Sequence, residues 1–233
     1  MTMLATVCAR GGSKGVPDKN IMMLNGQPVI AYTLQRIRES GLFDTIAVSS
    51  DSARILDVAR EWGAEVLVDR PAALASDSAG KLPAIRHCAH QAEVEVGQVF
   101  DVIVDFDATS PLRSVDDIRG AYELFASSGA TNLLTACPSH KSPYFNMVEV
   151  DAGGRVHLSK PLGEAIVRRQ DAPKTYDMNA SIYMWTRDSL FSEAPLFQEG
   201  TVLYVMPAER SVDIDTVLDF KLVSLLLSEA QEA

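Results

Sequence analysis

Residues 8–20, CARGGSKGVPDKN, combine glycine with positive charge directly after an apolar run. The cationic residues Arg10, Lys14 and Lys19 are interspersed with Gly11, Gly12 and Gly15, and Ser13 lies among them. Glycine lets a backbone adopt positive φ and approach a ligand closely, and converging N–H groups bind anions. The segment therefore favours a phosphate-binding loop, although a surface turn with solvated charges also fits. It has neither the GxxxxGK[ST] nor the GxGxxG pattern, so it is no Walker A loop and no dinucleotide fingerprint.

A second candidate is the segment Ser211–Thr216, SVDIDT, near the other end of the chain. In an extended backbone, Asp213 and Asp215 project to one side and Ile214 to the other, toward the core. Two carboxylates beside a phosphate site suit Mg²⁺, which takes oxygen ligands and is often shared with substrate phosphates. The alternative is purely structural: Asp215 would cap the last helix and Asp213 would be solvated.

Three further polar segments could line a site. Residues 75–80, ASDSAG, precede a helical pattern and could cap that helix or place hydroxyl groups near a ligand. Residues 105–113, DFDATSPLR, follow an apolar strand pattern and could line a site or simply build a turn. Residues 168–171, RRQD, could recognise carboxylate or phosphate groups, or be a solvated charged run.

The elements that must position these segments alternate between strand and helix. Strands are expected at 3–9, 45–50, 64–68, 101–106, 131–137, 180–186 and 202–206. Helices are expected at 28–40, 52–62, 80–93, 115–127 and 215–230. Such alternation predicts βαβ units, hence an α/β fold with a mostly parallel sheet and helices on both faces. In that fold, ligands bind beyond the carboxyl ends of the strands, where the loop at 8–20 would lie.

The alternation breaks at about 138–178, a polar stretch in which the sequence DAGG at 151–154 predicts a hairpin. We interpret the 233 residues as a single domain, 1–233, with an inserted lobe at 138–178. The net charge of −10 argues against a nucleic-acid partner. No apolar run is long enough to cross a membrane, and no secretory leader is recognisable. Three scattered cysteines indicate reduced thiols, as expected of a cytoplasmic protein.

Taken together, the motifs resemble the acylneuraminate cytidylyltransferase family, the CMP-sialic acid synthetases. The resemblance covers nearly the whole chain. It is carried by ARGGSKGVPDKN (9–20), RPAALASDSA (70–79), ATSPLR (108–113), RRQD (168–171), NASIY (179–183) and SVDID (211–215). It implies a Rossmann-like three-layer α/β/α nucleotidyltransferase fold. It also implies a Mg²⁺-dependent reaction in which the anomeric hydroxyl of a nine-carbon 2-keto acid attacks the α-phosphate of CTP.

The resemblance assigns roles to individual residues. Those implied to hold the triphosphate are Arg10, Gly11, Gly12, Ser13, Lys19 and Asn20. Those implied to contact the cytidine are Arg70, Ser76, Asp77 and Ser78. Asp213 and Asp215 are implied to bind Mg²⁺, and one of them to help deprotonate the hydroxyl. Those implied to face the sugar are Asp107, Thr109, Arg169, Gln170, Asn179 and Tyr183. The lobe at 138–178 is implied to form a homodimer and to reach the partner's active site.

Two positions depart from the family pattern. Sialic acid synthetases usually carry glutamine where this chain has Asp107. A carboxylate accepts hydrogen bonds but does not donate them, and it repels an anionic keto acid unless the sugar offers donors. The sugar is therefore expected to differ from N-acetylneuraminic acid, and DxDxTSPLR resembles the branch that acts on legionaminic acid. The second departure is Ala180, where relatives often have glycine.

Other functions remain compatible with parts of the pattern. Within the class, the alternatives are cytidylyltransferases for N-acetylneuraminic acid, pseudaminic acid or the eight-carbon acid Kdo; RRQD and NASIY disfavour Kdo. Sugar-1-phosphate nucleotidyltransferases open with a longer glycine-rich loop. A non-catalytic nucleotide-binding module would have less need of the paired aspartates.

Overall fold

The computed structural model describes residues 1–12, 16–76, 78–163, 166–192 and 194–232. The strands of the large sheet are β1 (Met3–Cys8), β4 (Thr45–Ser50), β5 (Val66–Asp69), β6 (Val102–Phe106), β7 (Asn132–Pro138), β10 (Tyr176–Thr186) and β11 (Thr201–Val205). The longer helices are α1 (Val29–Ser40), α2 (Ala53–Glu61), α4 (Lys81–Val96), α5 (Val115–Ser128) and α7 (Val217–Glu232). The short elements are β2 (Met23–Leu24), β3 (Gln27–Pro28), α3 (Ala72–Ala75), β8 (Val148–Val150), β9 (Val156–Leu158) and α6 (Arg187–Phe191).

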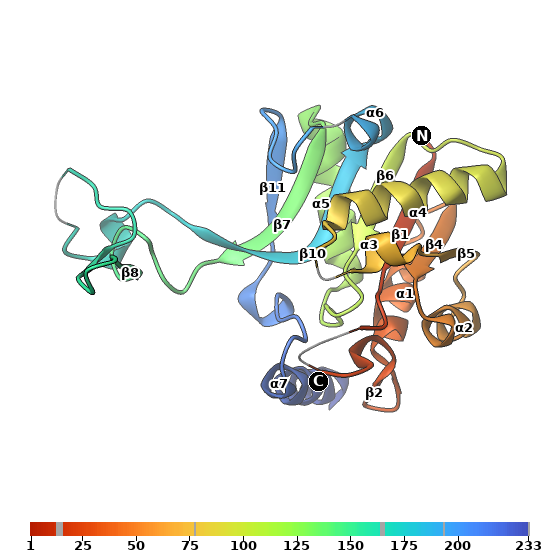
Figure 1. Cartoon of the computed structure of the whole chain (residues 1–233), viewed down its shortest axis with the longest axis horizontal. Coiled ribbons are helices and arrows are strands. Elements are labelled where there is room, and N and C mark those ends of the chain that lie inside the picture. Colours follow the sequence, from red (N-terminus) through yellow and green to blue (C-terminus); the bar gives the residue numbers. More distant parts are fainter. Residues whose placement is uncertain (13–15, 77, 164–165, 193, 233) are drawn as a thin grey trace.

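The seven strands of the large sheet lie in the order β11-β7-β10-β6-β1-β4-β5. β1 pairs in parallel with β4 and β6, β4 with β5, and β7 with β11, whereas β10 runs antiparallel between β6 and β7. The predicted mostly parallel sheet is confirmed. The carboxyl ends of β1, β4, β5 and β6 consequently meet at one edge (Figure 1), where the loop after β1 begins.

Helices cover both faces of the sheet, and each face has its own core. Apolar side chains of α1, α2 and α5 pack on one face against residues such as Val7, Val48 and Phe106. Those of α4 and α6 pack on the other face against residues such as Leu4 and Trp185. Successive strand side chains alternate between the two cores, as the pleat requires. The fold is therefore the three-layer α/β/α arrangement that the sequence predicts.

The closing helix α7 lies apart from the sheet and has a small core of its own. Val223 and Leu227 of α7 pack with Leu24, Val29 and Ile214. This cluster ties the end of the chain to the segment that follows the basic loop. It therefore holds the SVDID segment, residues 211–215, near that loop.

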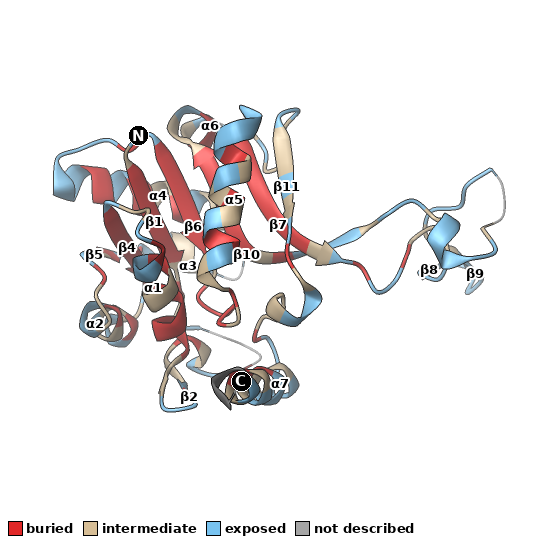
Figure 2. Ribbon diagram, turned by 180° about the vertical axis from the view of Figure 1, so that it is seen from behind, coloured by how far each residue is buried: buried red, intermediate tan, exposed pale blue. Residues whose placement is uncertain are grey.

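Residues 139–175 form a long arm that projects from the sheet edge (Figure 1). β8 and β9 pair as the predicted hairpin at its far end, and Asp151 accepts the N–H groups of Gly153 and Arg155 in the turn. Figure 2 shows most of the arm as exposed or half-buried, in contrast to the buried strands of the body, and Ser139 and Ser142 near its base are buried. Large apolar side chains are exposed along it: Met147, Val148, Val150, Val156, Leu162 and Val167. Tyr176–Met178, predicted to belong to the insert, already pair with β7 as the start of β10.

No helix in the described part of the chain is both long and apolar enough to span a membrane.

Candidate active site

The basic loop leaves the carboxyl end of β1 and is held by one hydrogen bond within the loop and one to Asp51, which follows β4. The Asn20 side chain donates to the Arg10 carbonyl at 3.0 Å, and the Gly11 N–H donates to Asp51 at 2.8 Å. A Cβ on Gly11 would lie 3.1 Å from the Cβ of Ser52, so the close approach favours glycine there. Gly12 has open space around it. The predicted triphosphate ligand Ser13 lies outside the described residues.

Lys19 joins the basic loop to the far end of the chain. Its Nζ donates to the carbonyl of Ile214 and to Oδ1 of Asp215, both at 2.8 Å. The lysine side chain is only 18% exposed, whereas the aspartate is 69% exposed. The contact places a cation from the loop directly beside the predicted metal ligands, although the residues are 196 positions apart in sequence.

Asp213 and Asp215 flank a fully buried Ile214, as their spacing predicts. The Ile214 N–H donates to the Thr109 carbonyl at 2.9 Å, which fixes the segment against the loop after β6. Burial, and then the nearby charge of Asp215, raise the pKa of Asp213 to about 6. Thr216 and Asp219 cap α7 by reciprocal hydrogen bonds, so the alternative in which Asp215 caps this helix is wrong.

The donor set at these two aspartates fits Mg²⁺. Burial and then the charge of Asp215 disfavour the ionised form of Asp213 and raise its pKa, and a divalent cation beside both carboxylates would favour that ionised form. Carboxylate oxygens are the ligands that Mg²⁺ prefers, with the remaining positions left to substrate phosphates and water. Asp213 and Asp215 are the residues of this chain that would hold the ion, and among the described residues no group of three His, Cys, Asp or Glu side chains suited to a metal occurs.

A cavity of about 240 Å³ opens between the basic loop, the segment after β5 and the start of α4. Its lining includes Arg10, Arg70, Ser76, Lys81 and Asp107. All but Lys81 were predicted from the sequence, and the fold brings the five residues together from the loop after β1, the segment 70–79, α4 and the loop after β6. Arg70 is held in place by its bonds to the Ser49 side chain and carbonyl, at 3.1 and 2.7 Å.

The rest of the predicted cytidine segment adjoins this cavity. The hydroxyl groups of Ser76 and Ser78 lie 3.4 Å apart, and both side chains are exposed. Asp77 lies outside the described residues. The hydroxyl groups could therefore turn toward a ligand without breaking a buried contact.

Lys81 is the residue that the sequence analysis missed. Its Nζ lies 3.3 Å from Oδ2 of both Asp105 and Asp107, and 4.5 Å from the centre of the Tyr183 ring. Burial lowers the pKa of Lys81, but the two carboxylates outweigh burial and raise it above its usual value. The only sequence signal was its position, directly after ASDSAG at the start of α4.

The loop after β6 holds Asp107 in a fixed orientation. The N–H and the hydroxyl of Thr109 donate to Oδ1 of Asp107, at 2.9 and 2.7 Å. Burial raises the pKa of Asp107, but Lys81 and Thr109 outweigh burial and lower it to about 2. Beneath the loop, the buried Arg113 donates to Ser181 and to Thr33. Thr109, which the sequence analysis predicts to contact the sugar, orients the side chain of Asp107.

Asn179 is buried and fully engaged with protein groups. Its carbonyl accepts from Thr135 at 2.7 Å and from the Ser181 N–H at 3.2 Å, and its amide donates to Ser211 at 2.9 Å. Ser211 opens the segment that carries the two aspartates. The next residue, Ala180, has a φ of +52°, at the irregularity in the pairing of β10 with β7. Asn179 therefore links β10 to the candidate metal site.

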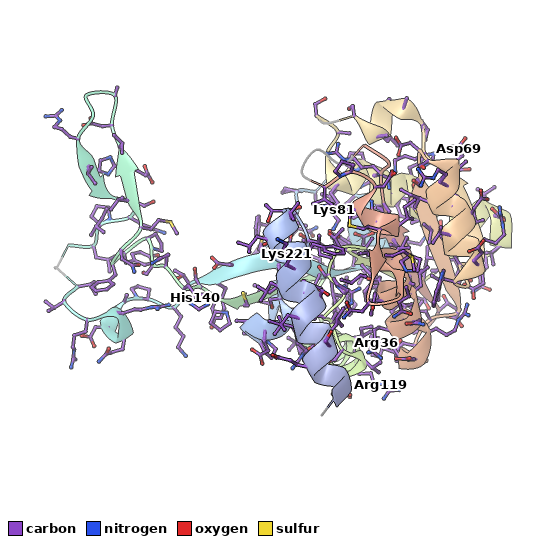
Figure 3. The ribbon with its side chains drawn as sticks, turned by 90° about the horizontal axis from the view of Figure 1, so that it is seen from below. Arg36, Asp69, Lys81, Arg119, His140 and Lys221 are labelled. Atoms are coloured by element: carbon purple, nitrogen blue, oxygen red, sulfur yellow. The ribbon has the colours of Figure 1, made fainter. Side chains whose placement is uncertain are left out.

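The remaining predicted sugar residues separate into two places. Tyr183 is buried in β10, stacks on Trp185, and turns its ring toward Lys81. Arg169 and Gln170 lie on the arm and line a different cavity, of about 570 Å³, together with Ser139 and Tyr176. Figure 3 shows this separation: Lys81 lies in the body, and His140 marks the base of the arm. In the part of the chain that the structure describes, Arg169 and Gln170 thus line a different cavity from Arg10 and Lys81.

Fold and site together define a class of protein. A mostly parallel sheet presents a cationic glycine loop, a cavity and two aspartates at the carboxyl ends of its strands, which is an arrangement suited to an anionic nucleotide and a metal. The sequence model of the family described as Cytidylyltransferase matches residues 4–224. The chain belongs to this family, and it is a nucleotidyltransferase.

Individual relatives cover the chain almost completely. It is 45% identical to the "CMP-N,N'-diacetyllegionaminic acid synthase" of Campylobacter jejuni, over 97% of this chain and 95% of the relative. It is 43% identical to the "Post-translational flagellin modification protein B" of Campylobacter coli, over the same shares. Among solved structures, a CMP:2-keto-3-deoxy-manno-octonic acid synthetase complexed with CTP matches with a TM-score of 0.69, at 16% identity and with all of both chains covered. At that identity the structural match shows the fold alone.

Proposed function

We propose that this protein transfers CMP from CTP to the anomeric hydroxyl of a nonulosonic acid, releasing pyrophosphate, and that its preferred acid is legionaminic acid. The observation that carries the proposal is the chain of contacts at the basic loop: Lys19 bonds Asp215, and the neighbouring Asn20 bonds the carbonyl of Arg10, which lines the cavity. Nucleotidyl transfer needs positioning and charge neutralisation more than covalent help. The name of the 45%-identical relative supports the choice of sugar.

In this proposal each charged group has a defined task. Arg10 and Lys19 neutralise the triphosphate, with Lys19 nearest the reacting α-phosphate. Arg70 and the hydroxyl groups of Ser76 and Ser78 hold the cytidine. Asp213 and Asp215 would hold Mg²⁺, which supplies further neutralisation of phosphate charge when bound. One of these carboxylates accepts the proton of the attacking hydroxyl.

The arm is proposed to complete the site of a partner subunit in a homodimer. Arg169 and Gln170 lie on the arm and away from the cavity of their own subunit. The arm also exposes apolar side chains, such as Val150 and Val156, of the kind that mark an interaction surface. A second copy would cover them and bring an arginine to the carboxylate of the acid. A cytoplasmic location is part of the proposal and can be tested by cell fractionation.

The test is pyrophosphate release from CTP and Mg²⁺ with a panel of legionaminic, pseudaminic, N-acetylneuraminic and Kdo acids. The proposal predicts turnover with nonulosonic acids and the highest kcat/KM for legionaminic acid. A preference for N-acetylneuraminic acid would keep the reaction and refute the choice of sugar. No release with any acid, from folded protein that binds CTP, would favour a nucleotide-binding module.

A further inference from the structure

The outer side of α7 carries apolar side chains that the proposed reaction does not use. Leu218, Leu222 and Leu225 recur at helical spacing, on the side opposite the buried Val223 and Leu227. Leu218 is 73% exposed and Leu225 is 56% exposed. A helix that is apolar on opposite sides is normally covered on both. We call these three leucines the leucine stripe, and its exposure indicates a binding surface for another element.

The β8–β9 hairpin at the end of the arm has an apolar face of its own. Val148 pairs with Leu158, and Val150 pairs with Val156. Paired residues point to the same side of a ribbon, and so do residues two apart in a strand, so these four side chains form one surface, which we call the hairpin face. Val150 is 65% exposed and Val156 is 66% exposed. Because an isolated two-stranded hairpin is at best marginally stable, this face also calls for a covering element.

In one subunit the two surfaces lie apart. Figures 1 and 3 both show the hairpin at the far end of the projecting arm and α7 on the body. In Figure 3, His140 marks the base of the arm and Lys221 marks α7. The element that covers either surface therefore comes from another molecule, and a second copy of this chain offers a surface of the right kind for each.

Charge favours a contact between the arm and α7 over a contact of α7 with itself. Residues 139–175 contain six Lys or Arg and four Asp or Glu, so the arm carries +2 in a chain whose net charge is −10. The leucine stripe lies among Asp215, Asp219 and Glu229, and Lys221 is the only cation in residues 215–229. Two α7 helices packed together would bring like charges close, whereas the basic arm would meet opposite charge.

We propose that the hairpin face of each subunit docks on the leucine stripe of its partner. The inference rests on the proposed function, in which the arm completes the partner's site, and it names the surface that receives the arm. The inner side of α7 packs against Ile214, between the two candidate metal ligands. An arm seated on α7 therefore lies next to the segment that carries both aspartates. In a two-fold dimer this contact occurs twice.

The first measurement is the dissociation constant of the dimer, from sedimentation over a dilution series. Leu222→Glu and Val150→Glu each place a charge in both copies of the contact, so each should raise this constant by about 100-fold or more. Val94→Glu is the matched control, because Val94 is 66% exposed on α4, away from both surfaces, and it should leave the constant unchanged. Dissociation should also make the specific activity of Leu222→Glu and Val150→Glu depend on protein concentration.

Cross-linking identifies which surfaces meet. Leu222→Cys and Val150→Cys, one of them carrying a tag that changes its size, are mixed and treated with a bismaleimide. The inference predicts a product that joins a tagged to an untagged chain in the mixture. If Leu222→Cys alone gives the main product, α7 pairs with α7; if Val150→Cys alone does, the two arms pair with each other. Either result overturns the inference. Wild type, treated in parallel, reports any product of the native cysteines.

Pyrophosphate release by the same proteins separates this inference from the proposed function. Turnover by wild type, together with an unchanged dissociation constant in folded Leu222→Glu, would overturn the docking surface and leave the reaction intact. The expected cross-link without turnover on any acid would refute the reaction and leave the docking surface intact. A monomeric wild type would overturn both the docking surface and the role of the arm. Thermal unfolding identifies a glutamate variant that fails to fold, and the cysteine variants, which add no charge, then decide the test.

Discussion

Replacing Asn179 by alanine tests whether this residue positions the candidate metal site or contacts the sugar. The substitution removes a weak contact with the sulfur of Met206 and three hydrogen bonds, to Thr135, Ser181 and Ser211. Each contributes about 1 kcal/mol net, so the free energy of unfolding should fall by about 3 kcal/mol. For a chain of this length that lowers the melting temperature by roughly 6–12 °C. Since Ser211 opens the SVDID segment, the Mg²⁺ concentration needed for half-maximal activity should rise.

Asn132 provides a matched control for this prediction. It is also buried, is the first residue of β7, and makes two hydrogen bonds, with Leu196 and Thr201. Asn132→Ala should lower stability by about 2 kcal/mol, because two hydrogen bonds are lost. It should leave the Mg²⁺ requirement unchanged. Melting temperatures and Mg²⁺ titrations of pyrophosphate release measure both effects.

Two results would refute a positioning role of Asn179. If both asparagine variants require the same Mg²⁺ concentration as wild type, Asn179 does not position the aspartates. If the KM for the acid rises in Asn179→Ala while the Mg²⁺ requirement stays constant, the residue contacts the sugar, as the family resemblance implies, and the positioning role is wrong.

Three more predictions follow from single contacts. Ala180 has a φ of +52°, which glycine adopts more readily than alanine, so Ala180→Gly should raise the free energy of unfolding by up to about 1 kcal/mol in denaturant titrations. Gly41→Ala, at a φ of +68°, should lower it by about 1 kcal/mol for the same reason. Burial raises the pKa of Asp117, but the hydrogen bonds from Arg210 and from Ser114 at the start of α5 outweigh burial and lower it. The ionised Asp117 therefore stabilises the fold above pH 3.8, its usual pKa, and this stabilisation is lost as the pH falls through the lowered pKa. Asp117→Asn should therefore be less stable at pH 7, and its stability should fall less steeply in acid unfolding experiments. Lys19→Met should lower kcat by about 10²- to 10³-fold in steady-state assays, since it removes a cation preorganised beside the reacting phosphate.

Local sequence patterns predicted most of the body of the fold. The bounds of α1 were predicted to within one residue from the apolar face of Ile30, Leu34 and Ile37 and from Gly41 after the helix. Both signals are local in the sequence: an amphipathic period, and a glycine that ends the helix in the left-handed conformation. The antiparallel insertion of β10 between β6 and β7 was not predicted. Strand order depends on pairing between distant segments, and no local pattern encodes it.

The sequence likewise predicted only those features of the candidate site that depend on local patterns. The alternation in SVDID correctly predicted that Ile214 is buried between two outward carboxylates. Lys81 was missed because a lysine at the start of a helix carries no local signal. Its meaning appears only when β6 brings Asp105 and Asp107 within 3.3 Å of it. Similarly, the contact of Lys19 with Asp215 joins opposite ends of the chain.

The most direct test of the central claim follows the oxygen atom of the acid. Legionaminic acid labelled with ¹⁸O at the anomeric hydroxyl is incubated with CTP, Mg²⁺ and the protein, and the products are analysed by mass spectrometry. Attack of that hydroxyl on the α-phosphate predicts that the label stays in the CMP-sugar and that the pyrophosphate is unlabelled. Label in the pyrophosphate, or a CMP-sugar that lacks it, would contradict the proposed reaction.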